Sequence, residues 1–142
     1  MSSCLCGLLF VKTVTPLFND AIAAFNRGDY FDAAEMFEKS IPDIEPDFKD
    51  LVGALNRIAA AMHLRFERGT RQGAINLLSQ AMLVLDDMKP ERGGIDTGRL
   101  FDEVFAFTEE IRASPRDERS GLKYRARIFI ERRRAPKINR AK

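Results

Sequence analysis

Four polar residues in this chain have the types and spacing that a small catalytic or metal-binding site could use. Glu35 and Glu38 lie three residues apart, so their carboxylates share one face if the segment is helical. Asn56 and His63 lie seven residues apart, which is two helical turns, and they flank an apolar stripe. If the two faces meet, two carboxylates, an amide and an imidazole converge, and such groups can in principle hold a divalent metal.

This polar cluster is incomplete as catalytic machinery. His63 is the only histidine of the sequence and has no nucleophile motif beside it, so a Ser-His-Asp triad is not indicated. The sequence also has no Walker loop, dinucleotide fingerprint or zinc-ligand spacing. We therefore predict no catalytic residue, no bound metal and no cofactor. In the alternative interpretation, His63 and the glutamates satisfy one another or pair with Arg57 or Arg65, because a buried charge needs a partner.

Asp96 has a simpler interpretation. It follows the glycine pair at 93–94 and precedes an apolar helical stripe, so Asp96 or Thr97 is a natural N-cap, which contributes about 1 kcal/mol. A functional aspartate is the alternative. The two glycines follow no predicted strand, so they do not indicate a nucleotide-binding loop.

The charge of the chain is unevenly distributed. Residues 115–142 contain eleven lysines and arginines and three acidic residues, a net charge of +8, whereas residues 1–114 carry −6. Such a tail can contact an anionic partner, either the phosphates of a nucleic acid or an anionic membrane surface. It can also stay solvated or lie across its own acidic body. The candidate anion-binding residues are Arg125, Arg127, Arg132, Arg133, Arg134 and Lys137.

The tail also contains an apolar stripe at helical spacing. Leu122, Ala126, Phe129 and Ile130 would share one side of a helix, with arginines such as Arg125, Arg132 and Arg133 on the other. We expect this segment to pack onto the rest of the protein through Phe129 and Ile130, and the chain to fray from about Ala135.

Composition and length bound the class of protein. A chain of 142 residues with 45% hydrophobic and 31% charged residues is typical of one soluble globular domain. Its two cysteines, Cys4 and Cys6, cannot brace a fold, so a reducing compartment and a cytoplasmic location are expected. The apolar run at 4–11 is far shorter than the roughly 20 residues of a membrane span. We divide the chain into an apolar N-terminal segment (1–14), a helical bundle (15–114) and a basic C-terminal segment (115–142).

The spacing of apolar residues predicts helices almost throughout. Five stripes with helical periodicity lie between residues 17 and 111, separated by glycine or proline. Alternation with a period of two is weak and confined to the tail. The expected fold class is all-α, a compact bundle of five or six helices built from antiparallel helical hairpins.

Two segments repeat the same pattern at an offset of 41 residues. In each, a glycine follows a phenylalanine, an alanine follows five residues later, and a large apolar residue comes four further on. The glycine allows the chain to reverse with positive φ, and the alanine allows the two helices to approach closely. The matched pairs are Phe25 with Phe66, Gly28 with Gly69, Ala33 with Ala74, and Phe37 with Leu78.

Each hairpin resembles the centre of a tetratricopeptide repeat. That resemblance implies a protein-interaction module with a concave groove between the first and third helices. The offset of 41 exceeds the ~34 residues of the repeat, and two copies are fewer than the roughly three needed to share a stacked core.

Three blocks in order also resemble the domain-of-unknown-function family numbered 309. The first block carries Phe25, Asn26, Gly28, Tyr30, Phe31, Asp32, Ala33, Glu35 and Glu38; the second carries Gly53, Leu55, His63, Gly69, Gly73 and Ala74; the third carries Gly94, Ile95, Asp96 and Leu100. The resemblance implies a compact helical fold with a polar cluster, without an assigned reaction. This chain has Ala34 where the family pattern has histidine, and Asn56 where it has glutamine.

The sequence thus favours a non-enzymatic binding or structural protein with a degenerate polar cluster. Its partner is unknown: self-association, a protein partner and a weak anionic partner for the tail all remain open. The alternatives are a metal-dependent enzyme that uses Glu35, Glu38 and His63, and a tetratricopeptide-like module.

Overall fold

The computed structural model describes residues 15–115 and 121–141, and these fold as an all-α bundle, as the sequence predicts. The described residues form six α-helices and two short 3-10 turns, at Ile41–Asp43 and Pro46–Phe48. The helices are α2 (Pro16–Arg27), α3 (Tyr30–Ser40), α4 (Lys49–Glu67), α5 (Gln72–Asp86), α6 (Thr97–Ala113) and α7 (Leu122–Arg133). The predicted N-terminal apolar segment, 1–14, lies outside the described residues.

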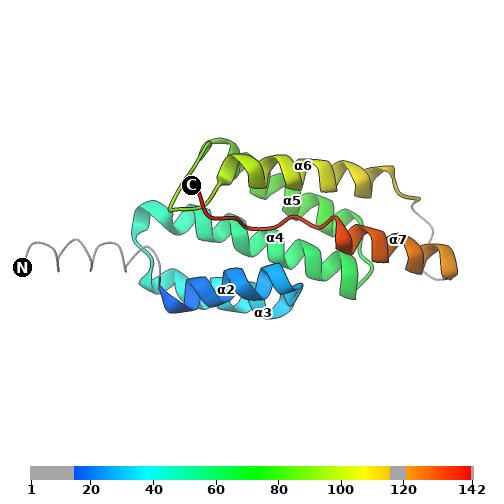
Figure 1. Ribbon diagram of the computed structural model, residues 1–142, viewed down its shortest axis with the longest axis horizontal. Coiled ribbons are helices and arrows are strands. Elements are labelled where there is room, and N and C mark those ends of the chain that lie inside the picture. The colour runs from blue at the N-terminus through cyan, green and yellow to red at the C-terminus, as the bar shows by residue number, and fades with distance from the viewer. Residues whose placement is uncertain (1–14, 116–120, 142) are drawn as a thin grey trace, which may run out of the picture.

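Consecutive helices from α2 to α6 run antiparallel, and each packs against the next (Figure 1). After α7 the chain does not return as a helix. Residues 134–141 run back along the bundle in an extended conformation, between α2 and α6 (Figure 1). We call residues 134–141 the C-terminal strap.

The two repeated glycines turn the chain as the sequence predicts. Gly28 has φ +90° and ends α2, with its N–H donating to the carbonyls of Ala24 and Phe25. Gly69 has φ +68°, and a Cβ atom there would lie 2.9 Å from the Tyr124 hydroxyl. Both positions therefore favour glycine, because other residues rarely adopt positive φ, and a side chain at Gly69 would also displace the Tyr124 hydroxyl.

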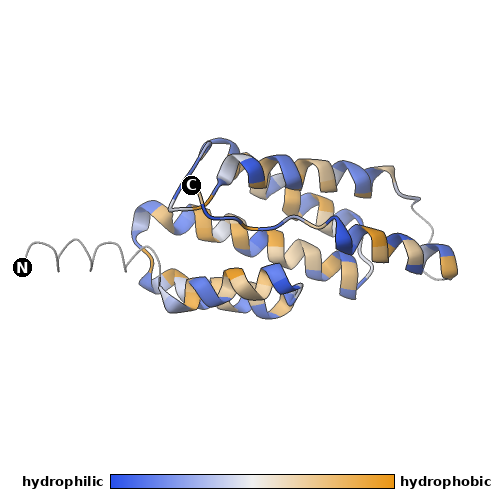
Figure 2. Ribbon diagram, viewed as in Figure 1, coloured by the Kyte–Doolittle hydropathy of each residue, from blue (hydrophilic) through white to orange (hydrophobic). Residues whose placement is uncertain are grey.

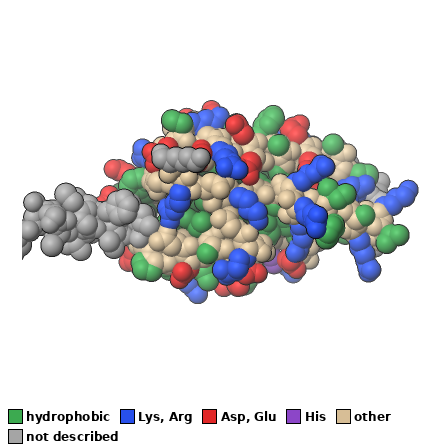
Figure 3. Space-filling view, in the orientation of Figure 1, with side chains coloured by type: hydrophobic (Ala, Val, Ile, Leu, Met, Phe, Trp, Pro, Cys, Tyr) green, Lys and Arg blue, Asp and Glu red, His purple; other side chains and the backbone are tan. Residues whose placement is uncertain are grey.

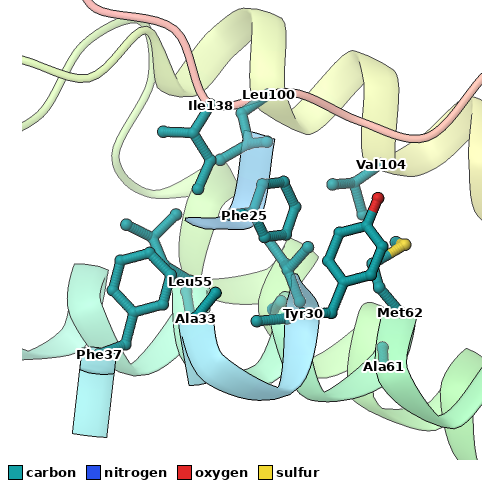
Figure 4. Close-up of a cluster of buried hydrophobic side chains, with 14 of the residues drawn as sticks. Phe25, Tyr30, Ala33, Phe37, Leu55, Ala61, Met62, Leu100, Val104 and Ile138 are labelled. Atoms are coloured by element: carbon teal, nitrogen blue, oxygen red, sulfur yellow. The ribbon is translucent and has the colours of Figure 1, made fainter. Parts of the chain in front are cut away.

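The core is formed by apolar stripes that face inward from the five helices α2 to α6, and the outward positions of these helices are mainly hydrophilic (Figure 2). Ala33 and Ala74, the repeated alanines, are completely buried where α3 and α5 pack on their neighbours. Figure 4 shows Phe25 of α2 between Leu55, Leu100 and Ile138. The strap thus supplies a core residue, and it closes the bundle between the first and last of the antiparallel helices.

None of the described helices is both long and apolar enough to cross a lipid bilayer.

Candidate functional site

The predicted polar cluster on α3 and α4 divides into separate environments. The Asn56 side chain donates a hydrogen bond from Nδ2 to the carbonyl oxygen of Ala34, at 2.7 Å, and so joins α4 to the backbone of α3. Glu35 and Glu38 are exposed on the outer side of α3. The amide at position 56 therefore serves packing between helices, and the two carboxylates face solvent.

His63 lies beside a different set of side chains. Its ring is 5.2 Å from the Phe31 ring, centroid to centroid, and it lines a shallow hollow of about 360 Å³. The carboxylates that line this hollow with His63 are Asp29, Asp32 and Glu67. His63 Nδ1 is buried without a hydrogen-bond partner among the described residues. Across residues 15–115 and 121–141, no three His, Cys, Asp or Glu side chains are grouped to hold a metal ion.

Tyr30 forms the inner wall of the same hollow. It is buried, and its ring contacts both Phe25 and Phe66. Burial raises the pKa of the Tyr30 phenol above its usual value, and the positive charge of Arg132 partly offsets that rise. Tyr30 therefore stays protonated and acts as a core aromatic residue.

Asp96 is the N-cap of α6. Its carboxylate accepts a hydrogen bond from the backbone N–H of Arg99 at 3.0 Å, and its own N–H donates to the carbonyl of Asn139 in the strap. Asp96 thus starts a helix through its side chain and holds the strap through its backbone N–H, and the helix cap accounts for an aspartate here.

Asn26, which the family resemblance singles out, holds the strap through its amide. Its Nδ2 donates to the Ile138 carbonyl at 3.0 Å, and its Oδ1 accepts from the Ile138 N–H at 2.9 Å. The Lys137 Nζ donates to the Asn26 carbonyl at 2.7 Å. A single amide therefore satisfies both backbone groups of a residue 112 positions away.

A buried ion pair between α4 and α7 is the site that the sequence analysis missed. Arg65 donates from Nε and Nη2 to the two carboxylate oxygens of Glu131, both at 2.8 Å, and from Nη2 to the Ser114 hydroxyl at 3.3 Å. Arg65 is 4% exposed and Glu131 is fully buried. One sequence signal could have found this pair, because Glu131 is the single acidic residue in residues 121–142.

This ion pair sets the rotation of α7, and it overturns the predicted orientation of the tail stripe. Glu131 is the only buried residue of α7. Leu122, Phe129 and Ile130 are 84%, 59% and 45% exposed, and Ala126 is exposed with them. The prediction that Phe129 and Ile130 pack onto the bundle is wrong. Leu122, Ala126 and Phe129 lie on the side of the helix opposite Glu131, and Ile130 lies about 100° around the helix from it. We call Leu122, Ala126, Phe129 and Ile130 the outer apolar face of α7.

The strap overturns a second expectation about the tail. Fraying was predicted from about Ala135, but Ala135 and Ile138 are 5% and 3% exposed and belong to the core. The described tail lies across its own acidic body, one of the predicted alternatives. Arg132 pairs with Glu67 at 2.7 Å, and Arg134 reaches Glu110 at 3.4 Å.

The remaining cations of the tail have different surroundings. Arg127 is half-buried and engaged in a contact. Lys123 and Arg125 are exposed and have no acidic partner among the described residues. The Arg133 guanidinium lies 4.9 Å from the centroid of the Phe129 ring, within the outer face itself. Four of the six candidate anion-binding residues, Arg127, Arg132, Arg134 and Lys137, thus make contacts within the fold, and the remaining two border the outer apolar face.

A second, larger hollow lies where α4 turns into α5. Its volume is about 770 Å³, and it opens to solvent. Arg68, Arg71, Thr70 and Tyr124 contribute hydrogen-bond donors to its lining, and Arg71 Nη2 donates to the carbonyl oxygen of Arg112 at 2.6 Å. Both hollows therefore occur at the end of α4 that faces α7.

No family model matches the chain, and no solved structure matches it. A curated relative from Aquifex aeolicus (strain VF5), described as an uncharacterized protein, is 30% identical over 105 residues. The aligned region covers 73% of this chain and 30% of the relative, so the chain spans less than a third of that protein's length. The similarity to the domain-of-unknown-function family therefore stays a prediction.

Proposed function

We propose that this chain is a non-enzymatic helical binding module, related to the domain-of-unknown-function family numbered 309 and located in the cytoplasm. Its binding surface is the outer apolar face of α7. The polar residues that the family resemblance highlights support this proposal through their contacts. Asn26 and Asn56 direct their amides to backbone groups of the strap and of α3. Asp96 caps α6. These side chains stabilise the fold, and their hydrogen-bonding groups are used in contacts within it.

The observation that carries the proposal is the exposure of Leu122, Phe129 and Ile130 along one side of α7. In Figure 3 hydrophobic and basic side chains gather together over α7, at the right-hand end of the molecule. Single exposed apolar residues are common on protein surfaces, but a contiguous apolar patch with a polar rim is typical of an interaction site.

The rim defines the chemistry of the ligand. Lys123, Arg125 and Arg133 surround the patch, whereas the one carboxylate of α7 is buried and paired with Arg65. A suitable ligand therefore combines apolar surface with negative charge. Burying a phenylalanine or isoleucine side chain contributes about 1.5–3 kcal/mol, so the apolar residues should dominate the affinity and the cations should add selectivity.

The dye anilinonaphthalene sulfonate tests this surface because it is itself apolar and anionic. We expect the native, folded protein to enhance its fluorescence, since the dye responds to exposed apolar surface. The double variant Phe129→Ser/Ile130→Ser should bind the dye at least about tenfold more weakly, because most of the apolar contact is lost.

The matched control is Leu83→Ser on α5, which removes a leucine that is 74% exposed and lies outside the α7 surface. It should leave dye binding unchanged. Circular dichroism of each variant verifies that the helices are intact. Dye binding that is absent from the native protein, or that survives the double variant, would contradict the proposal.

A further inference from the structure

We propose that the ligand of the outer apolar face is an anionic lipid surface, on which α7 lies as an interfacial helix. This inference rests on the proposed function and names the partner of the same surface. It concerns binding at the membrane surface, with the helix axis in the plane of the headgroups.

The arrangement of side chains around α7 fits this geometry. Successive residues of an α-helix are about 100° apart, so Leu122, Ala126 and Phe129 lie within one narrow stripe. Arg125 follows one side of that stripe, and Lys123 follows the other. Arg132 lies on the same side as Arg125 but is paired with Glu67. Arg133 ends it, with its guanidinium over the Phe129 ring. Apolar side chains that enter the acyl layer would thus carry cations on both flanks, at the level of the lipid phosphates.

The position of α7 makes this face accessible. The N-terminal half of the helix extends past the ends of α4 and α5, at one end of the long axis of the molecule (Figure 1). The opposite side of the helix is fixed by the ion pair of Glu131 with Arg65 and by the contact of Ile128 with the core. The outer face is therefore held in a set orientation on a folded body.

Electrostatics favours an anionic layer. Glu131, the single acidic residue of α7, is fully buried and neutralised by Arg65, so the exposed surface of the helix carries only positive charge. Each lysine or arginine close to an anionic leaflet adds about 1 kcal/mol of attraction, which corresponds to about fivefold in binding. The cytoplasmic leaflet carries this negative charge, in agreement with the proposed location.

Other partners use only part of this surface. A nucleic acid would contact the cations and leave Leu122 and Phe129 exposed to water. A second copy docked through the same face would bring the two sets of cations together, which is unfavourable. One face of a 12-residue helix, roughly 18 Å long and about 10 Å wide, is also much smaller than the ~800 Å² that each partner of a stable protein complex buries.

The test is co-sedimentation of the full chain with lipid vesicles. The vesicles contain phosphatidylcholine alone or phosphatidylcholine mixed with phosphatidylserine, each at low and at high salt. We expect binding to the mixed vesicles that falls as salt rises, and little binding to phosphatidylcholine alone. Phe129→Ser should weaken binding at least about tenfold, and Arg125→Gln about fivefold.

Two control variants match these changes away from α7. Leu83→Ser removes an exposed leucine of α5, and Lys39→Gln removes an exposed cation of α3. Both should bind mixed vesicles like the unchanged chain. Because every comparison uses the full chain, residues 1–14 contribute equally to all measurements.

The outcomes separate this inference from the proposed function. Failure to bind mixed vesicles, with dye binding still dependent on Phe129 and Ile130, would overturn the lipid assignment and leave the binding surface in place. Loss of both signals would overturn both proposals. Vesicle binding that the α7 variants leave unchanged would overturn the lipid assignment. The lipid assignment would also be overturned if vesicles do not bind and the chain instead forms a dimer, or binds duplex RNA, in a way that the same variants abolish.

Discussion

Replacing Glu131 by alanine is expected to destabilise the protein by about 3–5 kcal/mol, measured as the free energy of unfolding in urea. The carboxylate accepts two hydrogen bonds of 2.8 Å from Arg65, and both side chains are withdrawn from solvent. Removing one partner leaves the Arg65 guanidinium buried without a counter-ion, and the cost of its desolvation is then uncompensated. A loss of this size would be a large part of the stability of a domain of this length.

Two further variants isolate the ion pair as the cause. Glu109→Ala breaks the exposed pair of Glu109 with Arg112 and should cost less than about 1 kcal/mol, because solvent screens that pair. The double variant Arg65→Met/Glu131→Leu should recover most of the stability that Glu131→Ala loses, since no unpaired charge remains. If Glu131→Ala is no more damaging than Glu109→Ala, the orientation of α7 described above is wrong.

The second large effect is expected in the strap. Ile138→Ala should lower the free energy of unfolding by about 2–5 kcal/mol, because Ile138 is 3% exposed and packs with Phe25 and Leu100 in the core (Figure 4). Asn139→Ala, one position further, should change stability by less than about 0.5 kcal/mol. The Asn139 side chain makes one long hydrogen bond, 3.4 Å to the carbonyl of Lys137, at the surface.

Equal and small effects of these two substitutions would show that the strap does not close the core. That result would agree with the fraying that the sequence predicts from Ala135. Chemical denaturation followed by circular dichroism measures both variants on one scale.

The helical fold could be predicted because its determinants are local. The stripe that contains Phe25, the turn at Gly28 and the alanine at 33 all lie within a few residues of one another. Apolar spacing selects the helices, and a glycine with positive φ selects the reversal. The cap at Asp96 is local in the same sense, because its carboxylate binds an N–H three residues ahead.

The tail could not be predicted because its contacts are distant in sequence. The partner of Glu131 is 66 residues away, and the partner of Ile138 is 112 residues away. Periodicity identifies an apolar side of α7 but does not show whether that side faces the bundle or solvent. The simplest expectation is that it faces the bundle, but the buried ion pair of Glu131 turns it outward. The prediction of the polar cluster was limited for the same reason. The spacing of Asn56 and His63 does not reveal that Asn56 binds a backbone carbonyl on another helix.

The most direct test of the proposed binding surface measures how exposed two adjacent residues of α7 are to water. The chain contains no tryptophan, so a single substitution gives an unambiguous fluorescence signal. Phe129 belongs to the outer apolar face, whereas Ile128 packs against the core. We expect acrylamide to quench the indole of Phe129→Trp several-fold more efficiently than that of Ile128→Trp. More efficient quenching at position 128 than at position 129 would contradict the account.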